Sequence, residues 1–496
     1  MTLEDTPVDP VPPTRRALRA SSGQITLPEQ KSAAPAAVST AAPVVATEAT
    51  STAAAPLALS WLDAETVRAR TYAPQGIELA PGVQPVVRDL LADAPRDSVW
   101  RPSIVAPIGL VLLVVVGYVA TALVWPLSAI PPQIAAAEVT PAAAPAAVME
   151  WPAAGSAAVA VQGIGGPVAS ATKSVPIASI TKVVTALLVL EEMPLAVGEQ
   201  GPKFSFSSSD HGSYLANGES ALKVPVGGSL TEYQMLEGML MGSANNYADR
   251  LASDLWPTDA VFATAANRWL TSHGIDGITI VNPSGYSSRN KATPAALLAL
   301  ARRALANPVI AEIVAKPSVK LPGAGTVKNT NKLLADPGVV GIKTGTLKTY
   351  TVLSAKDVTI GDTTVRLYAS VLGQKNDAAR VAASRSLYTQ LEQQLQLVPS
   401  VTAGTSAGAV TTAWGEKIDV VVKSDASVVL WNGAAPAATV DVSLAGADEK
   451  GDIVGSLTVT GPLNAQTVDL ALASDVEGPS PWWRLTHPLE LFGLGR

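Results

Sequence analysis

The sequence predicts an α+β fold, with one central sheet that carries a helical insert, followed by a small all-β domain. Helical patterns lie between two groups of β-prone runs, which is typical of a single sheet interrupted by helices. After Val401 the composition changes to short alternating segments separated by Gly, Asp and Pro, which indicates an all-β domain. A third observation is the uncharged stretch Ile104–Trp125, which predicts one transmembrane helix ahead of both domains.

The composition excludes several classes of function. The 496-residue chain has a formal net charge of −6 and 15% charged residues, so no nucleic-acid-binding surface is expected. It has no cysteine, which excludes disulfides, thiol catalysis and thiolate metal sites. Its histidines are far apart and lack metal-ligand spacing: His211, His273 and His487. A zinc peptidase and a serine–histidine triad are therefore disfavoured, and we expect no metal and no cofactor.

The N-terminal 100 residues are rich in Ala, Pro, Ser and Thr and have no sustained apolar period. We expect residues 1–100 to form a disordered tail. Arginines precede the apolar stretch at positions 88, 96 and 101, whereas no Lys or Arg follows it until Lys173. By the positive-inside rule, this asymmetry predicts a cytoplasmic tail and an extracytoplasmic remainder.

The apolar stretch is long enough to be a membrane anchor. As a helix, residues 104–125 would span roughly 33 Å, and Pro107 would fall in the first turn, where proline is tolerated. The alternative is a signal peptide cleaved near Ala135–Ala137. The length of the run, and its position about 100 residues into the chain, favour a retained anchor. Residues 126–152 then form a Pro/Ala-rich spacer.

A serine and a lysine open the most apolar helix of the next segment. The run Val183–Leu190 indicates a helix buried in a domain centre, and Ser179 and Lys182 share one face at its start. Burial favours the neutral amine, which can accept the hydroxyl proton and make the serine a nucleophile. The same spacing occurs in three other places that open no long apolar helix: Ser170/Lys173, Ser220/Lys223 and Ser288/Lys291.

The other elements of this domain, residues 153–397, follow from local patterns. Thr231 and Gln234 form a capping box that opens a helix over Glu232–Met241. Further helices are expected at Asn246–Leu255, Pro294–Leu305 and Ala378–Leu395. Strands are expected at Ala157–Val161, Pro167–Ser170, Val339–Ile342, Thr351–Ala355 and Val365–Leu372.

The C-terminal part divides into a β domain and an aromatic tail. Residues 401–475 contain five expected strands, at Ile418–Val422, Ser427–Leu430, Thr439–Leu444, Ser456–Thr460 and Thr467–Leu470. The tail, residues 476–496, contains Trp482 and Trp483. It fits two interpretations equally well, a membrane-interface segment and a segment that packs onto the β domain.

Three separated motifs carry a family resemblance. Ser179–Lys182, Ser243–Asn245 and Lys343–Gly345 occur in this order, with starts 64 and 100 residues apart. This order and spacing resemble the penicillin-recognising serine enzymes, specifically the D-alanyl-D-alanine carboxypeptidases among the low-molecular-weight penicillin-binding proteins. The stretches MLMGSANNYADRLA, VNPSGYS, GIKTGT and SVLGQKNDAAR look similar as well. The resemblance covers about residues 155–395. It implies a penicillin-binding/β-lactamase-like transpeptidase fold, with a central antiparallel sheet and a helical insert.

The resemblance also implies catalytic roles. Ser179 attacks a peptide carbonyl and Lys182 accepts its proton. The backbone N–H groups of Ser179 and Thr346 stabilise the oxyanion. Ser243 relays a proton to the leaving amine, and Asn245 holds Lys182 and the substrate amide.

On the substrate side, the resemblance implies that Lys343 adds a positive charge facing Ser243 and the substrate. Thr344 offers a hydroxyl to the terminal carboxylate, and Gly345 lets the peptide lie against the strand as an added strand. Arg380 falls where similar enzymes place an arginine on the carboxylate side of the site. The alternative for Arg380 is a surface charge on a helix.

The sequence departs from the family at Ser284, which stands where relatives often carry a histidine, and at 295–296, which lack a common acidic residue. These departures affect fine specificity and leave the core chemistry intact.

We therefore expect a membrane-anchored, serine-type D-alanyl-D-alanine carboxypeptidase that removes the terminal D-Ala from peptidoglycan stem peptides. Its expected partners are the stem peptide, β-lactam antibiotics as inhibitors, the lipid bilayer and a cytoplasmic partner of the N-terminal tail. A DD-endopeptidase, a transpeptidase and a β-lactamase are alternatives within the same chemistry. The β-lactamase is disfavoured because no Glu-x-x-x-Asn follows Asn245. A non-catalytic cell-wall scaffold is the alternative from another class.

Overall fold

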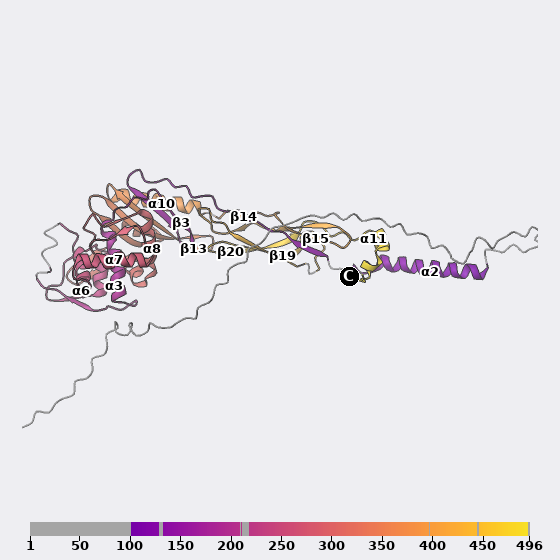
Figure 1. Ribbon diagram of the computed structural model, residues 1–496, viewed down its shortest axis with the longest axis horizontal. Coiled ribbons are helices and arrows are strands. Elements are labelled where there is room, and N and C mark those ends of the chain that lie inside the picture. Colours follow the sequence, from indigo (N-terminus) through magenta and orange to yellow (C-terminus); the bar gives the residue numbers. More distant parts are fainter. Residues whose placement is uncertain are drawn as a thin grey trace, which may run out of the picture. The chain divides into compact units, whose positions relative to one another are not determined.

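The computed structural model describes residues 101–127, 132–208, 210, 218–395, 397–443 and 446–494. The expected disordered tail, residues 1–100, lies outside the described residues. Figure 1 shows the described part as a mixed helix-and-sheet domain, a β domain and the helix α2 (Pro102–Val124). The predicted α+β fold with a separate β domain is confirmed.

The centre of the mixed domain is a five-stranded antiparallel sheet with the order β11-β12-β13-β2-β3. Its strands are β2 (Ser156–Val161), β3 (Ile164–Ala169), β11 (Val339–Thr346), β12 (Tyr350–Ile360) and β13 (Thr363–Gln374). Strands β2 and β13 pair in the register Leu367↔Val161, so the hairpin before the helical insert completes the sheet formed after it. Strand β11 lies at one edge of this sheet.

The helical insert lies between β3 and β11 in the chain. Its helices are η2 (Ala178–Ile180), α3 (Thr181–Glu192), α5 (Glu232–Leu240), α6 (Asn245–Leu255), α7 (Asp259–Ser272), α8 (Pro294–Ala306) and α9 (Pro308–Ala315). Its short elements are β4 (Val175–Pro176), β5 (Lys203–Ser205), β6 (Ser229–Thr231), β7 (Ile278–Thr279), β8 (Lys291–Ala292), β9 (Ser318–Leu321), β10 (Gly325–Lys328) and η3 (Lys332–Ala335). Every residue of α3 from Thr181 to Leu190 is buried, as the apolar run predicts.

Alternate residues of the sheet face two different cores. Ala158 and Ala160 of β2 pack with the helical insert, whereas Val159 and Val161 pack with α10 (Asp377–Gln394). This alternation is the two-residue period of a strand that is buried on both faces. The sheet is therefore covered on one side by the insert and on the other by α10, and one end of β11 is brought against α3.

The β domain contains a six-stranded sheet with the order β1-β15-β16-β20-β19-β18, packed around its own apolar cluster. Its strands are β1 (Gln133–Ala136), β15 (Ser406–Thr411), β16 (Lys417–Val422), β18 (Ala437–Val442), β19 (Ile453–Thr460) and β20 (Ala465–Leu472). The short strands β14 (Pro399–Val401) and β17 (Ala426–Ser427) pair with each other.

The segment expected to be a free spacer is structured in part. Gln133–Ala136 forms β1, which pairs with β15 along four residues. The chain then continues along the β domain, with Ala142 N donating to Ser400 O at 2.7 Å and Ala144 N donating to Ala434 O at 2.9 Å. The physical reason is that β15 would otherwise present an unpaired edge, which any extended segment can satisfy whatever its side chains.

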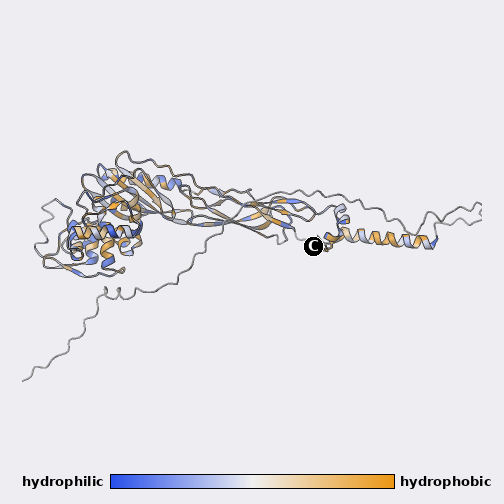
Figure 2. Ribbon diagram, in the orientation of Figure 1, coloured by the Kyte–Doolittle hydropathy of each residue, from blue (hydrophilic) through white to orange (hydrophobic). Residues whose placement is uncertain are grey.

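Helix α2 is long and apolar enough to cross a membrane. Its most apolar window has a mean hydropathy of 2.5, and no residue of that window is buried. Figure 2 shows apolar residues along its length. The helix begins two residues earlier than expected, with Pro102 at its first position, so Pro107 lies in the second turn.

Candidate active site

The serine and lysine at the head of α3 lie within hydrogen-bonding distance of each other. Ser179 belongs to the single turn η2, and Lys182 belongs to the first turn of α3. The distance between Lys182 Nζ and Ser179 Oγ is 3.0 Å. Ala178, directly before the serine, has a φ of 50°, which is strained for a residue with a side chain. The nucleophile candidate therefore sits in a backbone conformation that its surroundings impose.

Lys182 has two further partners, and both can only accept a hydrogen bond. Its Nζ lies 2.7 Å from Asn245 Oδ1 and 2.5 Å from the backbone oxygen of Ser284. A neutral amine has two N–H donors and one lone pair. The two acceptors take both N–H groups, so the lone pair is left facing the hydroxyl of Ser179, which can donate. The geometry thus arranges a base and its proton donor.

Electrostatics favour the neutral form of this lysine. Lys182 is fully buried. Burial lowers the pKa of Lys182 from 10.5 to about 7, and the nearby carboxylates of Asp249 and Glu219 limit the decrease. Near neutral pH a substantial fraction of the amine is therefore free to accept a proton.

Lys343, in β11, is a second buried amine of the site. Only 1% of the residue is exposed, and its Nζ has no hydrogen-bond partner among the residues that the structure describes. Burial, then the charges of Lys182 and Arg380, hold the pKa of Lys343 well below its usual value. An unpartnered buried amine is costly, and an anionic ligand group would satisfy it.

Close packing brings the end of β11 against the serine. A Cβ atom on Gly345 would lie 2.6 Å from the backbone oxygen of Ile177 and 3.0 Å from Cβ of Ala178. Only glycine allows this approach. The strand that carries Lys343 therefore lies directly against the turn that carries Ser179.

These elements surround a pocket of about 790 Å³. Of the predicted site residues, Ser179, Asn245 and Thr346 line it. Ser243 is outside this lining; it is 8% exposed and has a φ of 61°, again a strained backbone. Lys182 and Lys343 are buried and do not line the pocket. The candidate nucleophile Ser179 is therefore accessible from the pocket, whereas the two amines are not.

The comparisons with known proteins agree with these motifs. Residues 153–376 match the model of the D-alanyl-D-alanine carboxypeptidase family, and this range contains all three motifs. A curated relative, D-alanyl-D-alanine carboxypeptidase DacB2 of Mycobacterium tuberculosis, is 33% identical over 177 residues. That alignment covers 34% of this chain and 57% of the relative, little more than half of its length.

Solved structures that are similar to this chain include the following two. One is a peptidoglycan synthesis regulatory factor from Streptococcus pneumoniae, with a TM-score of 0.45 and 23% identity, covering 66% of this chain and 100% of that chain. The other is a penicillin-binding protein from Listeria monocytogenes in its ampicillin-bound form. It has a TM-score of 0.41 and 24% identity, and covers 49% of this chain and 99% of that chain.

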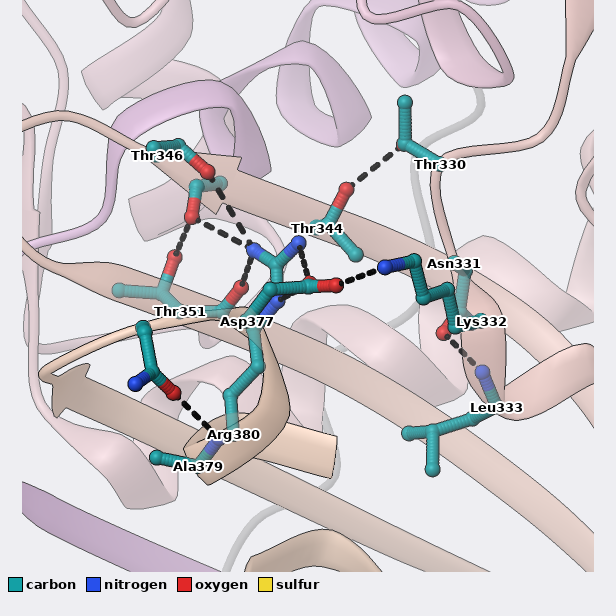
Figure 3. A network of polar contacts seen from close by, with 12 residues as sticks. Thr330, Asn331, Lys332, Leu333, Thr344, Thr346, Thr351, Asp377, Ala379 and Arg380 are labelled. Atoms are coloured by element: carbon teal, nitrogen blue, oxygen red, sulfur yellow. Dashed lines mark hydrogen bonds and ion pairs between the residues drawn. The ribbon is translucent and has the colours of Figure 1, made fainter. Parts of the chain in front are cut away.

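Thr344 and Arg380 of the mixed domain each have polar partners close to β11 (Figure 3). The Thr344 hydroxyl pairs with the Thr330 hydroxyl at 2.7 Å. Arg380 Nη1 donates to the backbone oxygens of Gly345 and Thr351, each at 2.9 Å, and its Nε donates to Asp377 at 2.8 Å. Only 5% of Arg380 is exposed, so it is not a surface charge. Its guanidinium fixes β11 to β12 at the site.

Replacing Arg380 with alanine should destabilise the chain by about 2–5 kcal/mol, because two buried carbonyls and a carboxylate lose their donor. Denaturant unfolding of both proteins measures this difference. Arg385→Ala is the matched control, since Arg385 lies on the same helix and pairs with Asp336 at an exposed position. An exposed pair of this kind contributes little to stability. Equal effects of the two substitutions would contradict the role of Arg380.

Sequence reasoning missed two carboxylates of the candidate site. Glu219 accepts a hydrogen bond from Asn245 Nδ2 at 2.7 Å, which orients the other atom of that amide, Oδ1, toward Lys182. Glu219 lies in a polar loop, and no spacing rule marked it. Asp249 follows Asn245 by four residues on α6, so the helical period could have indicated that both lie on one face. Burial raises the pKa of Asp249 to about 7.

The departure at Ser284 leaves the site intact. Lys182 contacts the backbone oxygen of Ser284 and not its side chain. A Cβ on the next residue, Gly285, would come 2.1 Å from the backbone oxygen of Ala178, so this loop packs directly on the turn before the nucleophile. The loop can pack this closely because residue 285 is glycine, and Lys182 uses only a backbone oxygen of the loop. Neither contact depends on the residue type at 284.

Proposed function

We propose that this chain is a membrane-anchored, serine-type D-alanyl-D-alanine carboxypeptidase that removes the terminal D-Ala from peptidoglycan stem peptides. The observation that carries the proposal is the arrangement of Lys182, whose two N–H groups are used by Asn245 and Ser284 and whose lone pair faces Ser179. The match of residues 153–376 to the model of the D-alanyl-D-alanine carboxypeptidase family supports the same reaction.

The proposed reaction has two halves. Ser179 Oγ attacks the carbonyl of the penultimate D-Ala while Lys182 takes the hydroxyl proton. The oxyanion is stabilised by the backbone N–H groups of Ser179 and Thr346. Collapse of this intermediate breaks the peptide bond, and Ser243 relays the proton held by Lys182 to the departing amine of the terminal D-Ala, which leaves Lys182 neutral for the second half. Water then hydrolyses the ester on Ser179, with Lys182 as the base, and releases the shortened peptide.

The substrate would bind along the edge strand of the central sheet. Strand β11 is at that edge, so an extended peptide can add to it as another strand. Lys343 and Thr344 supply a positive charge and a hydroxyl for the terminal carboxylate, and Gly345 permits a close approach. Arg380 supports this strand from behind through Gly345 O. The same features suit a β-lactam antibiotic, which carries a carboxylate beside a reactive carbonyl.

The proposal includes an anchor and a topology. Helix α2 would span the bilayer, with the N-terminal tail in the cytoplasm and everything after residue 126 outside. Strand β1 includes Ala135 and Ala136, so cleavage near Ala137 would remove a strand from the β domain. This pairing supports a retained anchor. On this topology the tail, residues 1–100, would be available to a cytoplasmic partner.

The test is product analysis with the purified full chain in detergent. A pentapeptide ending in D-Ala-D-Ala should yield free D-alanine and the tetrapeptide, whereas the same peptide ending in L-alanine should remain intact. Cleavage of cross-linked dimers without release of terminal D-alanine would favour an endopeptidase instead. Binding of cell-wall fragments with no cleavage of any peptide would favour the non-catalytic scaffold.

A further inference from the structure

The C-terminal segment of the chain folds against the end of helix α2. It contains two short helices, α11 (Pro481–Thr486) and α12 (Pro488–Leu491). We call Pro481–Leu494 the interfacial foot. Figure 1 shows α11 beside the end of α2 that leads into the β domain. Tyr118 OH, in the last two turns of α2, donates to the backbone oxygen of Leu485 at 2.6 Å.

Arg484 of the foot caps α2. Its Nη1 donates to the backbone oxygens of Ala122, Leu123 and Trp125, at 3.4, 3.2 and 2.9 Å. The last carbonyls of a helix have no partner within the helix, and they carry the negative end of its dipole. Such groups are costly wherever water is scarce, as at the border of a hydrocarbon layer. A cation that satisfies them fits the level at which a span leaves the bilayer.

The foot carries large apolar side chains that the described part of the chain leaves exposed. Trp482 is 74% exposed, Leu489 58% and Leu494 72%. Beside them, Phe492 packs edge-to-face on Trp125 at the end of α2, with ring centroids 4.9 Å apart. The segment that carries these exposed side chains therefore also packs on the end of the proposed span.

The neighbouring tryptophan behaves differently. Trp483 packs against Trp414 in the turn between β15 and β16, with ring centroids 6.2 Å apart, and stacks on His487. Each of the two interpretations of the tail thus fits one tryptophan: Trp483 contacts the β domain and Trp482 is left exposed. The foot connects the β domain to the end of α2 and directs apolar side chains outward.

We propose that the interfacial foot lies in the lipid–water interface on the extracytoplasmic side, with Trp482, Leu489 and Leu494 among the headgroups and upper acyl chains. This inference rests on the anchor in the proposed function. The occupant is the bilayer because the foot that carries these exposed side chains is held on the end of α2 by Arg484 and Phe492, and because tryptophan and arginine are typical of the interfacial region. The β domain is then attached to the membrane at two points, the span and the foot.

The experiment uses the absence of cysteine in the chain, which allows one labelled position at a time. Trp482→Cys and Leu489→Cys in the full chain are labelled with an environment-sensitive fluorophore and reconstituted into phosphatidylcholine–phosphatidylglycerol vesicles. The vesicles carry quenchers either at the headgroup or deep in the acyl chains. Leu113→Cys, in the middle of α2, reports insertion of the span, and Val226→Cys, an exposed position in the mixed domain, reports background.

We expect loss of emission at 482 and 489 with the headgroup quencher, at 113 with the deep quencher, and at 226 with neither. Quenching at 113 with no more quenching at 482 and 489 than at 226 would overturn the foot and leave the anchor in place. No quenching at 113 would overturn the anchor and the foot together. Protection of 482 from aqueous iodide without quenching by lipid would show that a protein covers this patch, and would also overturn the proposal.

Discussion

Replacing Ser179 with alanine should abolish covalent labelling of the chain by a fluorescent penicillin. Ser179 Oγ is the hydroxyl that lies 3.0 Å from the Lys182 amine, and without it no ester can form. Loss of a nucleophile typically lowers an acyl-transfer rate by about 10⁴-fold or more. Mass spectrometry of the penicillin-treated chain locates the adduct, which we expect on the peptide that contains residue 179.

The chain provides a matched control at Ser288. This serine also begins a Ser-x-x-Lys sequence and also lines the pocket, but both it and Lys291 are exposed. The pair therefore lacks the buried surroundings that Ser179 and Lys182 share. Ser288→Ala should therefore label like the unmodified chain. Labelling that persists in Ser179→Ala and disappears in Ser288→Ala would contradict the assignment of the nucleophile.

The sequence predicted those helices and strands whose conformation is determined by residues close together in the chain. The apolar run after Lys182 predicts the buried helix α3, and the pair Thr231 and Gln234 predicts the start of α5, where both capping-box hydrogen bonds are present. Strand β1 was not predictable in this way. Its side chains are all exposed, and the free edge of β15 determines its conformation. Such pairing leaves no pattern in the sequence of the added strand.

The site shows the same division. Motif spacing indicated Ser179, Lys182 and Asn245 because their relation is local or matches a family pattern. The roles of Glu219 and Arg380 depend on distances between segments far apart in the chain, to Asn245 in one case and Gly345 in the other. The helical position of Arg380 suited a surface charge and a buried donor equally well, and only the packing of α10 on the sheet decides between them.

Replacing Lys182 with methionine should lower the rate of acylation by penicillin about 10²–10⁴-fold, the usual contribution of a general base. Methionine keeps most of the buried volume and removes the proton acceptor. In the unmodified chain the rate should rise with pH around 7, because the amine must be deprotonated and its pKa is about 7. The measurement is the second-order acylation rate from pH 5 to 9, an interval of about two units on either side of that value.

Stability separates the role of Lys182 as a base from a packing role. The pKa of Lys182 is lower in the folded chain than in the unfolded chain. Below pH 7 the amine is charged in both states, and burying this charge lowers the free energy of unfolding by its full amount. The penalty decreases as the pH rises from 7 toward 10.5. Relative to the unmodified chain, Lys182→Met should therefore be most favoured at low pH and lose this advantage as the pH rises. A packing defect alone would give a difference in unfolding free energy that does not depend on pH.

Asp249 has a pKa of about 7 as well, and it must be distinguished from Lys182 as the group that controls the rate. Its negative charge raises the pKa of Lys182. If Lys182 is the base, Asp249→Asn removes that charge, lowers the pKa of the amine and moves the midpoint of the rate profile to lower pH. If Asp249 itself were the titrating group, the same substitution would remove the pH dependence near 7. The outcome therefore identifies the base: loss of the neighbouring negative charge lowers the pKa of Lys182 and shifts the midpoint, whereas loss of the titrating group itself would leave no transition near pH 7.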